Sequence, residues 1–215
     1  ILTNGDSCPF VELIPQIGLK IVHLSLVIMN LMSDNADVLV STTAASTLAD
    51  FIRFPGFPYA GKALSLLLNS SIDMSLANSL VLSRSAFSAL QNAVDKCPEK
   101  FLHPLMNLIL QLLNRFIMHN SDFWFIGHLC RVLQIIFLRV KGEIDEQVVV
   151  FSWGVFECIF NNYPDEVPSL FAPLTALGRS AGDLFLPYLE PTAGFLLNGL
   201  ENYGLEESIP SAASG

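Results

Sequence analysis

Histidine and serine are the side chains in this sequence that could carry acid–base, nucleophilic or metal-binding chemistry. The histidines are spread along the chain, at positions His23, His103, His119 and His128. None of them belongs to a His-x-x-x-His or Glu-x-x-His pattern, which would place two metal ligands on one face of a helix. We therefore expect structural histidines and no metal site.

The serines and glycines also lack the context of a catalytic or phosphate-binding motif. Gly178-Arg179-Ser180-Ala181-Gly182 resembles a nucleophile elbow, but a loop and a helix are predicted around it, whereas the elbow joins a strand to a helix. Gly61-Lys62 resembles the end of a phosphate-binding loop, but Pro55 and Pro58 would stiffen that loop and remove backbone amides. The sequence therefore predicts no cofactor and no enzymatic activity.

The composition favours helices that are buried in protein. Hydrophobic residues make up 52% of the 215 residues and charged residues only 14%, against a typical charged share of roughly 25%. The longest stretch without Asp, Glu, Lys or Arg, residues 101–114, is shorter than the about 18 residues of a membrane-spanning helix and contains Pro104. We expect no membrane span. Because the chain begins at Ile1 and has no leader pattern, we also expect it to be part of a longer protein.

The net charge and the cysteines restrict the kind of partner and compartment. The formal net charge of −9 disfavours direct binding of nucleic acid and favours partner proteins with basic segments. The cysteines form no Cys-x-x-Cys pair and stand at positions Cys8, Cys97, Cys130 and Cys158. We expect free, buried thiols in a reducing compartment.

An internal repeat organises the whole chain. Cys8-Pro9 and Cys97-Pro98 are each followed by a second proline, Pro15 or Pro104, and then by a long apolar segment. Pro9 and Pro98 are 89 residues apart, and Pro15 and Pro104 are separated by the same 89 residues. Half of this offset, about 44 residues, falls in the roughly 40–47 residues of HEAT and armadillo repeats. No segment has the setting of a strand. The sequence therefore predicts an all-α fold, a right-handed α-α superhelix of stacked HEAT-like helical hairpins over residues 1–215.

The apolar period of 3.6 residues divides this single domain into about four and a half helix pairs. First helices are predicted near residues 9–32, 58–70, 98–119, 144–161 and 183–202. Second helices are predicted near residues 35–53, 74–96, 121–141 and 165–179. Gly142 is a predicted helix stop, and Asp145 and Glu146 suit the first turn of the helix that follows.

Two kinds of side chain are candidates for partner binding. Trp124 and Trp153 are tryptophans, which are enriched in binding hot spots, although packing in the core is the alternative for both. Carboxylates gather at the predicted helix starts and hairpin turns, at Asp122, Glu143, Asp145, Glu146, Asp165 and Glu166. They could form an acidic rim for a basic segment, or they could cap helices and keep the surface soluble.

One stretch resembles a known family. Residues 181–202 contain Phe185, Tyr188-Leu189 and the ending Gly199-Leu200-Glu201-Asn202, which together look like a first helix of a karyopherin-β (importin-β) repeat. The segment Phe101-Leu102-His103-Pro104-Leu105 resembles the same kind of repeat.

The resemblance implies a cytoplasmic and nuclear transport receptor that binds basic cargo on an acidic concave surface and releases it under the control of Ran-GTP. The sequence contains no match to an acidic Ran-binding loop. A HEAT-repeat scaffold subunit of another multiprotein complex is the alternative.

Overall fold

The computed structural model describes residues 38–52, 59–76, 80–118, 125–140 and 142–203, together with a few positions between 17 and 27. Every element in these ranges is helical, so the chain is all-α there, as the sequence predicts. The chain divides into two compact units, Ile1–Leu108 and Ile109–Gly215. Each unit is described by itself below.

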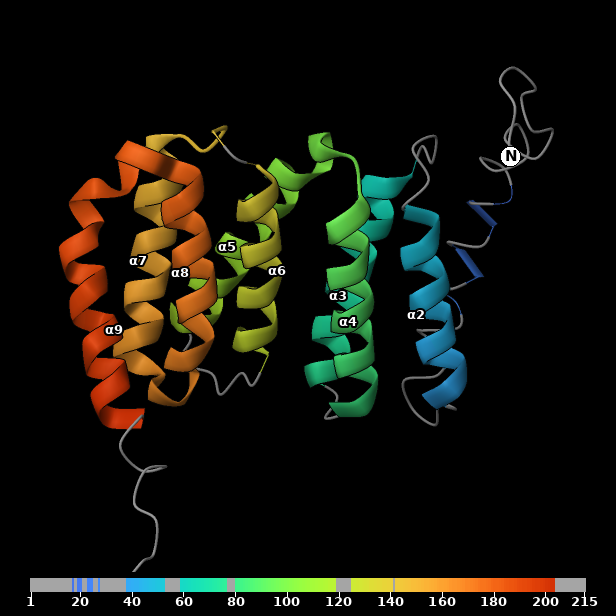
Figure 1. The fold of residues 1–215 in the computed structure, drawn as a ribbon. Helices are drawn as coiled ribbons and strands as arrows, with labels where there is room; N and C mark the ends of the chain where they lie inside the picture. Colours follow the sequence, from blue (N-terminus) through green and yellow to red (C-terminus); the bar gives the residue numbers. More distant parts are fainter. Residues whose placement is uncertain are drawn as a thin grey trace, which may run out of the picture. The chain divides into compact units, whose positions relative to one another are not determined.

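The first unit is built from packed helices of similar length. It contains α2 (Val38–Ile52), α3 (Ala60–Leu76) and α4 (Leu80–Lys96), then the short 3₁₀ turn η1 (Glu99–Phe101) and the start of α5 (Leu102–Met118). Helix α2 packs against both α3 and α4, and α3 packs against α4 (Figure 1). The core between them is apolar, and its largest fully buried side chains include Leu48, Ile52, Leu64, Leu67, Phe87 and Leu90.

Buried serine hydroxyls join α3 to α4 and correct one predicted boundary. We predicted that Asn69-Ser70-Ser71 ends one helix and that the next begins near residue 74, but α3 continues to Leu76. The Ser71 hydroxyl donates to the carbonyl of Leu67 at 2.6 Å, and the Ser83 hydroxyl of α4 donates to the carbonyl of Ser71 at 2.9 Å. Because these hydroxyls find partners inside the packed pair, they do not interrupt the helix.

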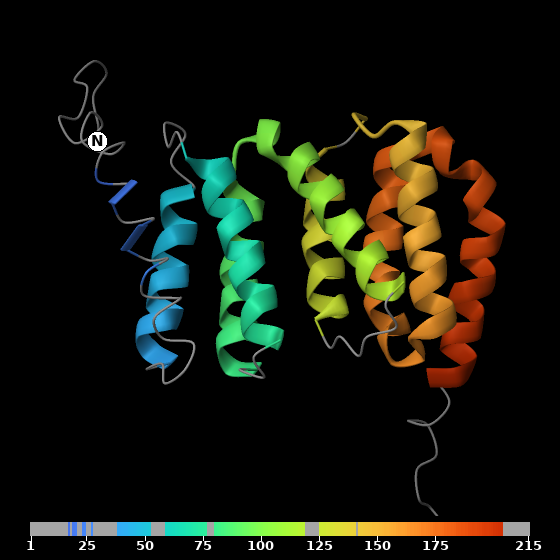
Figure 2. The same ribbon diagram turned by 180° about the vertical axis from the view of Figure 1, so that it is seen from behind.

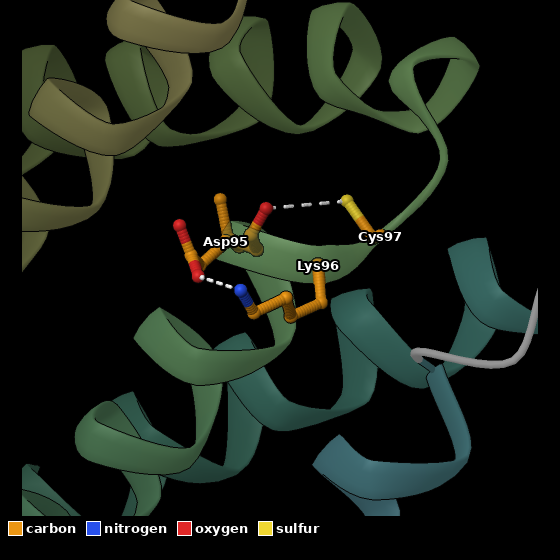
Figure 3. A network of polar contacts seen from close by, with 4 residues as sticks. Asp95, Lys96 and Cys97 are labelled. Atoms are coloured by element: carbon orange, nitrogen blue, oxygen red, sulfur yellow. Dashed lines mark hydrogen bonds and ion pairs between the residues drawn. The ribbon is translucent and has the colours of Figure 1, made fainter.

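Two local polar contacts lie at the C-terminal end of α4 (Figure 3). The Lys96 ammonium lies 3.1 Å from the Asp95 carboxylate, but both side chains are more than half exposed, so this pair contributes little stability. The thiol of Cys97 donates to the carbonyl of Val94 at 3.6 Å. Cys97 and Cys130 are free and buried and Cys158 is free and partly buried, while Cys8 lies outside the described residues.

The second unit is centred on α8. Its helices are α6 (Ile126–Arg139), α7 (Glu146–Asn162), α8 (Val167–Ala181) and α9 (Leu189–Tyr203), with the 3₁₀ segments η2 (Pro164–Glu166) and η3 (Gly182–Tyr188). Helix α8 packs against α6, α7 and α9, and α7 lies behind it in Figure 1 and in front of it in Figure 2. The Ser180 hydroxyl of α8 donates to the carbonyl of Phe137 of α6 and ties these two helices together.

Two of the predicted helices begin with a 3₁₀ segment instead of an α-helical turn. The helix predicted over 183–202 is a 3₁₀ segment up to Tyr188 and an α-helix only from Leu189. Pro187 lacks the backbone N–H that an α-helical turn would use, which is the physical reason for the split. The helix predicted from residue 98 likewise opens with η1 and becomes α-helical at Leu102.

Other predicted boundaries agree with the structure. Gly142 follows the end of α6 with a φ of 76°, a conformation that glycine adopts without strain. Asp145 is the N-cap of α7, and its carboxylate accepts the backbone N–H of Val148 at 2.8 Å. None of the described helices is long and apolar enough to cross a membrane.

Candidate functional site

A groove on one face of α7 is the candidate binding site of the second unit. It encloses about 530 Å³. Asn114 of α5 lines one side, and the other lining residues come from α7: Glu146, Gln147, Val150, Phe151, Gly154, Val155 and Cys158. These α7 positions recur at intervals of three and four residues, so they lie along a single stripe of the helix. Helix α7 faces the viewer in Figure 2.

The groove exists because α7 is apolar on more than one side. In the run Val148-Val149-Val150-Phe151, the side chain of Val149 is fully buried, while Val150 is 50% exposed and Phe151 is 40% exposed. A helix that packs on one side of its axis cannot bury four consecutive apolar residues. The remaining apolar side chains therefore form a surface patch, and exposed apolar patches are typical of interaction sites.

Gly154 gives the groove its depth. It follows Val150 by one helical turn, and a Cβ atom added there would meet no other atom within 4 Å. The thiol of Cys158 lies one turn further along the same stripe and is partly buried. An empty space over a glycine, flanked by valine and phenylalanine, can accept an apolar side chain from a partner.

The N-terminal end of the groove is acidic. Glu146 lines it, and Glu143 and Asp145 are exposed in the turn that leads into α7. Helix α7 itself contains no lysine or arginine. Arg115 is the one arginine of α5, and α5 contains no lysine. The negative charge at this end comes from α7 and its preceding turn, close to the positive end of the helix dipole.

The structure separates the predicted site residues into several groups. Glu143, Asp145 and Glu146 lie together at the start of α7, where Asp145 also acts as the N-cap. Asp165 and Glu166 belong to η2, which follows the opposite end of α7. Asp122 and Trp124 lie outside the described residues. The predicted acidic rim therefore divides, and only its first group borders the groove.

Trp153 packs in the core instead of lining the groove. It is only 8% exposed. Its indole stacks on Phe195 with ring centroids 5.4 Å apart and meets Phe185 edge-on at 6.4 Å. Tyr188 completes the contact at 5.3 Å. These contacts match the core-packing alternative for Trp153, and the exposed aromatic side chain of the groove is Phe151.

Glu166 is a half-buried carboxylate that caps a neighbouring helix. It accepts the backbone N–H of Gly127, in the first turn of α6, and the hydroxyl of Ser169 in α8. Burial raises the pKa of Glu166 above its ordinary value, although both hydrogen bonds oppose that shift. Burial, helped by the charge of Glu166, also raises the pKa of the Cys130 thiol, so this cysteine stays protonated and unreactive. The arrangement joins α6 to α8 and offers no open space for a ligand.

Sequence reasoning missed the apolar residues of the groove. Val150, Phe151 and Gly154 were not among the candidates, although the four apolar residues at 148–151 are a signal that one side of the helix stays uncovered.

In the described part of the chain, no group of three His, Cys, Asp or Glu side chains could hold a metal ion.

Comparison with known proteins finds no matching family model, no similar curated protein and no similar solved structure. The groove and its charge are therefore the features of this chain that point to a function.

Proposed function

We propose that this chain is a protein-binding helical-repeat module, a right-handed superhelix of stacked HEAT-like hairpins without catalytic activity. The packing within each unit supports this arrangement. Helix α2 packs on α4 in the first unit, and α6 packs on α8 in the second, so alternate helices lie against each other. In α-solenoids, equivalent helices of successive hairpins stack in this way and leave an extended surface for partners.

The apolar groove of α7, with its acidic N-terminal end, is the observation on which the proposal rests. Val150, Phe151 and Gly154 offer contact surface, and Glu146 offers negative charge at one end. A partner with basic and apolar residues in one segment matches both features.

A nuclear transport receptor that binds Ran-GTP is one form of this function, and a scaffold subunit of another complex is the other. The resemblance of residues 181–202 to a karyopherin-β repeat favours the first form. Its aromatic residues Phe185 and Tyr188 pack against Trp153, so they have a structural role that both forms share.

Peptide arrays test the general function, and Ran tests its special form. We expect the 215-residue chain to bind basic peptides with apolar residues more tightly than acidic peptides of equal length. Uniform absence of peptide binding would contradict the protein-binding function. Binding of Ran-GTP but not Ran-GDP by the chain would support the transport receptor, and equal failure of both would favour the scaffold.

A further inference from the structure

We infer that the α7 groove holds a large apolar side chain of a partner segment whose lysine or arginine residues contact the acidic start of α7. This inference rests on the proposed protein-binding function and adds the site, the anchor and the spacing of residues within the bound segment. The apolar anchor lies over Gly154, between Phe151 and Cys158. The basic residues lie beside Glu146.

The shape of the groove favours an anchor side chain. The volume of about 530 Å³ is within the roughly 300–1,000 Å³ of binding pockets that are lined mainly by apolar groups. Gly154 leaves the space above it open, and Val150 and Phe151 are half exposed beside it. A leucine or phenylalanine from a partner would cover these side chains and remove their apolar surface from water.

The charge of α7 favours a basic segment as the occupant. Its two carboxylates are Glu146 and Glu157, and no lysine or arginine of the helix opposes them. The turn before α7 adds Glu143 and Asp145, both exposed. An acidic peptide would be repelled from this end, whereas a basic one would be drawn toward it.

The geometry of α7 also sets the spacing within the partner. Glu146 and Gly154 are eight residues apart on one helix, which corresponds to about 12 Å along its axis. An extended segment, at roughly 3.3 Å per residue, spans that distance in about four residues. The expected ligand therefore has its basic cluster about four residues away from its apolar anchor.

Cys158 provides a direct reporter for occupancy of the groove. Cys97 and Cys130 are buried, and Cys8 can be replaced by serine, so Cys158 is the partly accessible thiol of the described residues. With a peptide that has three lysines four residues from a phenylalanine, we expect alkylation of Cys158 to slow at least fivefold at saturation. Peptide binding that leaves the alkylation rate unchanged would overturn the site and leave the general function standing.

A matched pair of glycine variants tests the anchor. Gly154→Leu fills the groove, while Gly194→Leu makes the same change in α9, where an added Cβ also meets nothing within 4 Å. Both changes raise helix propensity, so both variants should fold. We expect Gly154→Leu to weaken peptide binding at least tenfold and Gly194→Leu to leave it unchanged.

Equal affinity of the two glycine variants overturns the α7 groove as the binding site, while retained peptide binding keeps the protein-binding function. Loss of affinity when phenylalanine in the peptide is replaced by alanine supports the apolar anchor, and an unchanged affinity overturns it. Failure of every peptide to bind the unmodified chain overturns the inference together with the proposed function.

Discussion

Ser152 and Ser180 are two buried hydroxyls whose hydrogen bonding differs. Ser180 is 5% exposed, and its hydroxyl donates to the carbonyl of Phe137 across the contact between α8 and α6. Ser152 of α7 is fully buried, and its hydroxyl has no hydrogen-bond partner. A buried polar group without a partner lowers the stability of the fold, because it loses its hydrogen bond to water and gains none. The two serines therefore contribute to the fold with opposite signs.

Alanine at each serine should reveal these opposite contributions. We expect Ser152→Ala to raise the free energy of unfolding by about 1 kcal/mol, because it removes an unpaired buried hydroxyl. Ser180→Ala should lower it by about 1–2 kcal/mol, because the buried carbonyl of Phe137 loses this donor. Urea denaturation followed by far-UV circular dichroism measures both changes. A loss of stability in Ser152→Ala would mean that this hydroxyl has a partner in solution.

Glu166 should make stability depend on pH. The pKa of Glu166 is 4.5 in the unfolded chain and higher in the folded chain. At a pH between the unfolded and the folded pKa, the folded chain therefore binds more protons than the unfolded chain. The stabilisation is fully present below pH 4.5 and is lost as the pH rises through the folded pKa. We expect Glu166→Gln to flatten this decline when thermal unfolding is followed from about pH 4 upward. Glu166→Ala is the control, because it removes the acceptor of the Gly127 N–H at every pH and should lower stability throughout.

At the scale of the helices, sequence reasoning located boundaries that depend on local chemistry. The turn from Gly142 to Asp145 was predicted, because a left-handed glycine and an N-cap carboxylate act within a few residues. The boundary at Ser71 was misplaced, because its carbonyl accepts from Ser83, which approaches only after α4 has packed on α3. Side-chain hydrogen bonds between helices are invisible to a periodic pattern.

The candidate site was predictable only in part for the same reason. Glu146 was identified from its position at a helix start, whereas Val150, Phe151 and Gly154 were not. Which side of an apolar helix stays exposed depends on its neighbours, since Val149 is buried and Val150 beside it is half exposed. Trp153 was a candidate because of its residue type, but its contacts with Phe185 and Phe195 place it in the core.

Gly127 is the point at which α6 and α8 can be tested as a packed pair. A Cβ atom at this position would lie 2.7 Å from the Ser169 hydroxyl and 2.9 Å from the Glu166 carboxylate. We expect Gly127→Ala to lower the free energy of unfolding by about 1–3 kcal/mol, because the helix N-terminus and its cap are forced apart. Gly194→Ala in α9 is the control, where the added methyl group meets nothing and helix propensity should add up to about 1 kcal/mol. Equal stability of the two variants, measured by urea denaturation, would contradict the close packing at Gly127.

At the scale of the whole molecule, charge is distributed unevenly along the chain. The formal net charge is −9, and from Val140 to Gly215 the only cationic side chains are Lys141 and Arg179. The acidic start of α7 therefore belongs to the last third of the sequence, in which almost every charged side chain is acidic. Such a charge raises the rate at which a basic partner finds its site and does less for the lifetime of the complex.

Salt should therefore act mainly on the association rate of a basic peptide. Raising NaCl from about 20 mM to about 200 mM shortens the screening length from roughly 20 Å to below 10 Å, and we expect the association rate to fall about tenfold. The dissociation rate should change much less, because the apolar anchor over Gly154 is not screened. Stopped-flow fluorescence with a labelled peptide measures both rates, and a peptide with glutamine in place of each lysine is the control. Because that control has no charge to steer, its association should be slow and nearly independent of salt. A dissociation rate that rises tenfold while association stays constant would mean that contact charges, and not the field of the whole molecule, govern the binding.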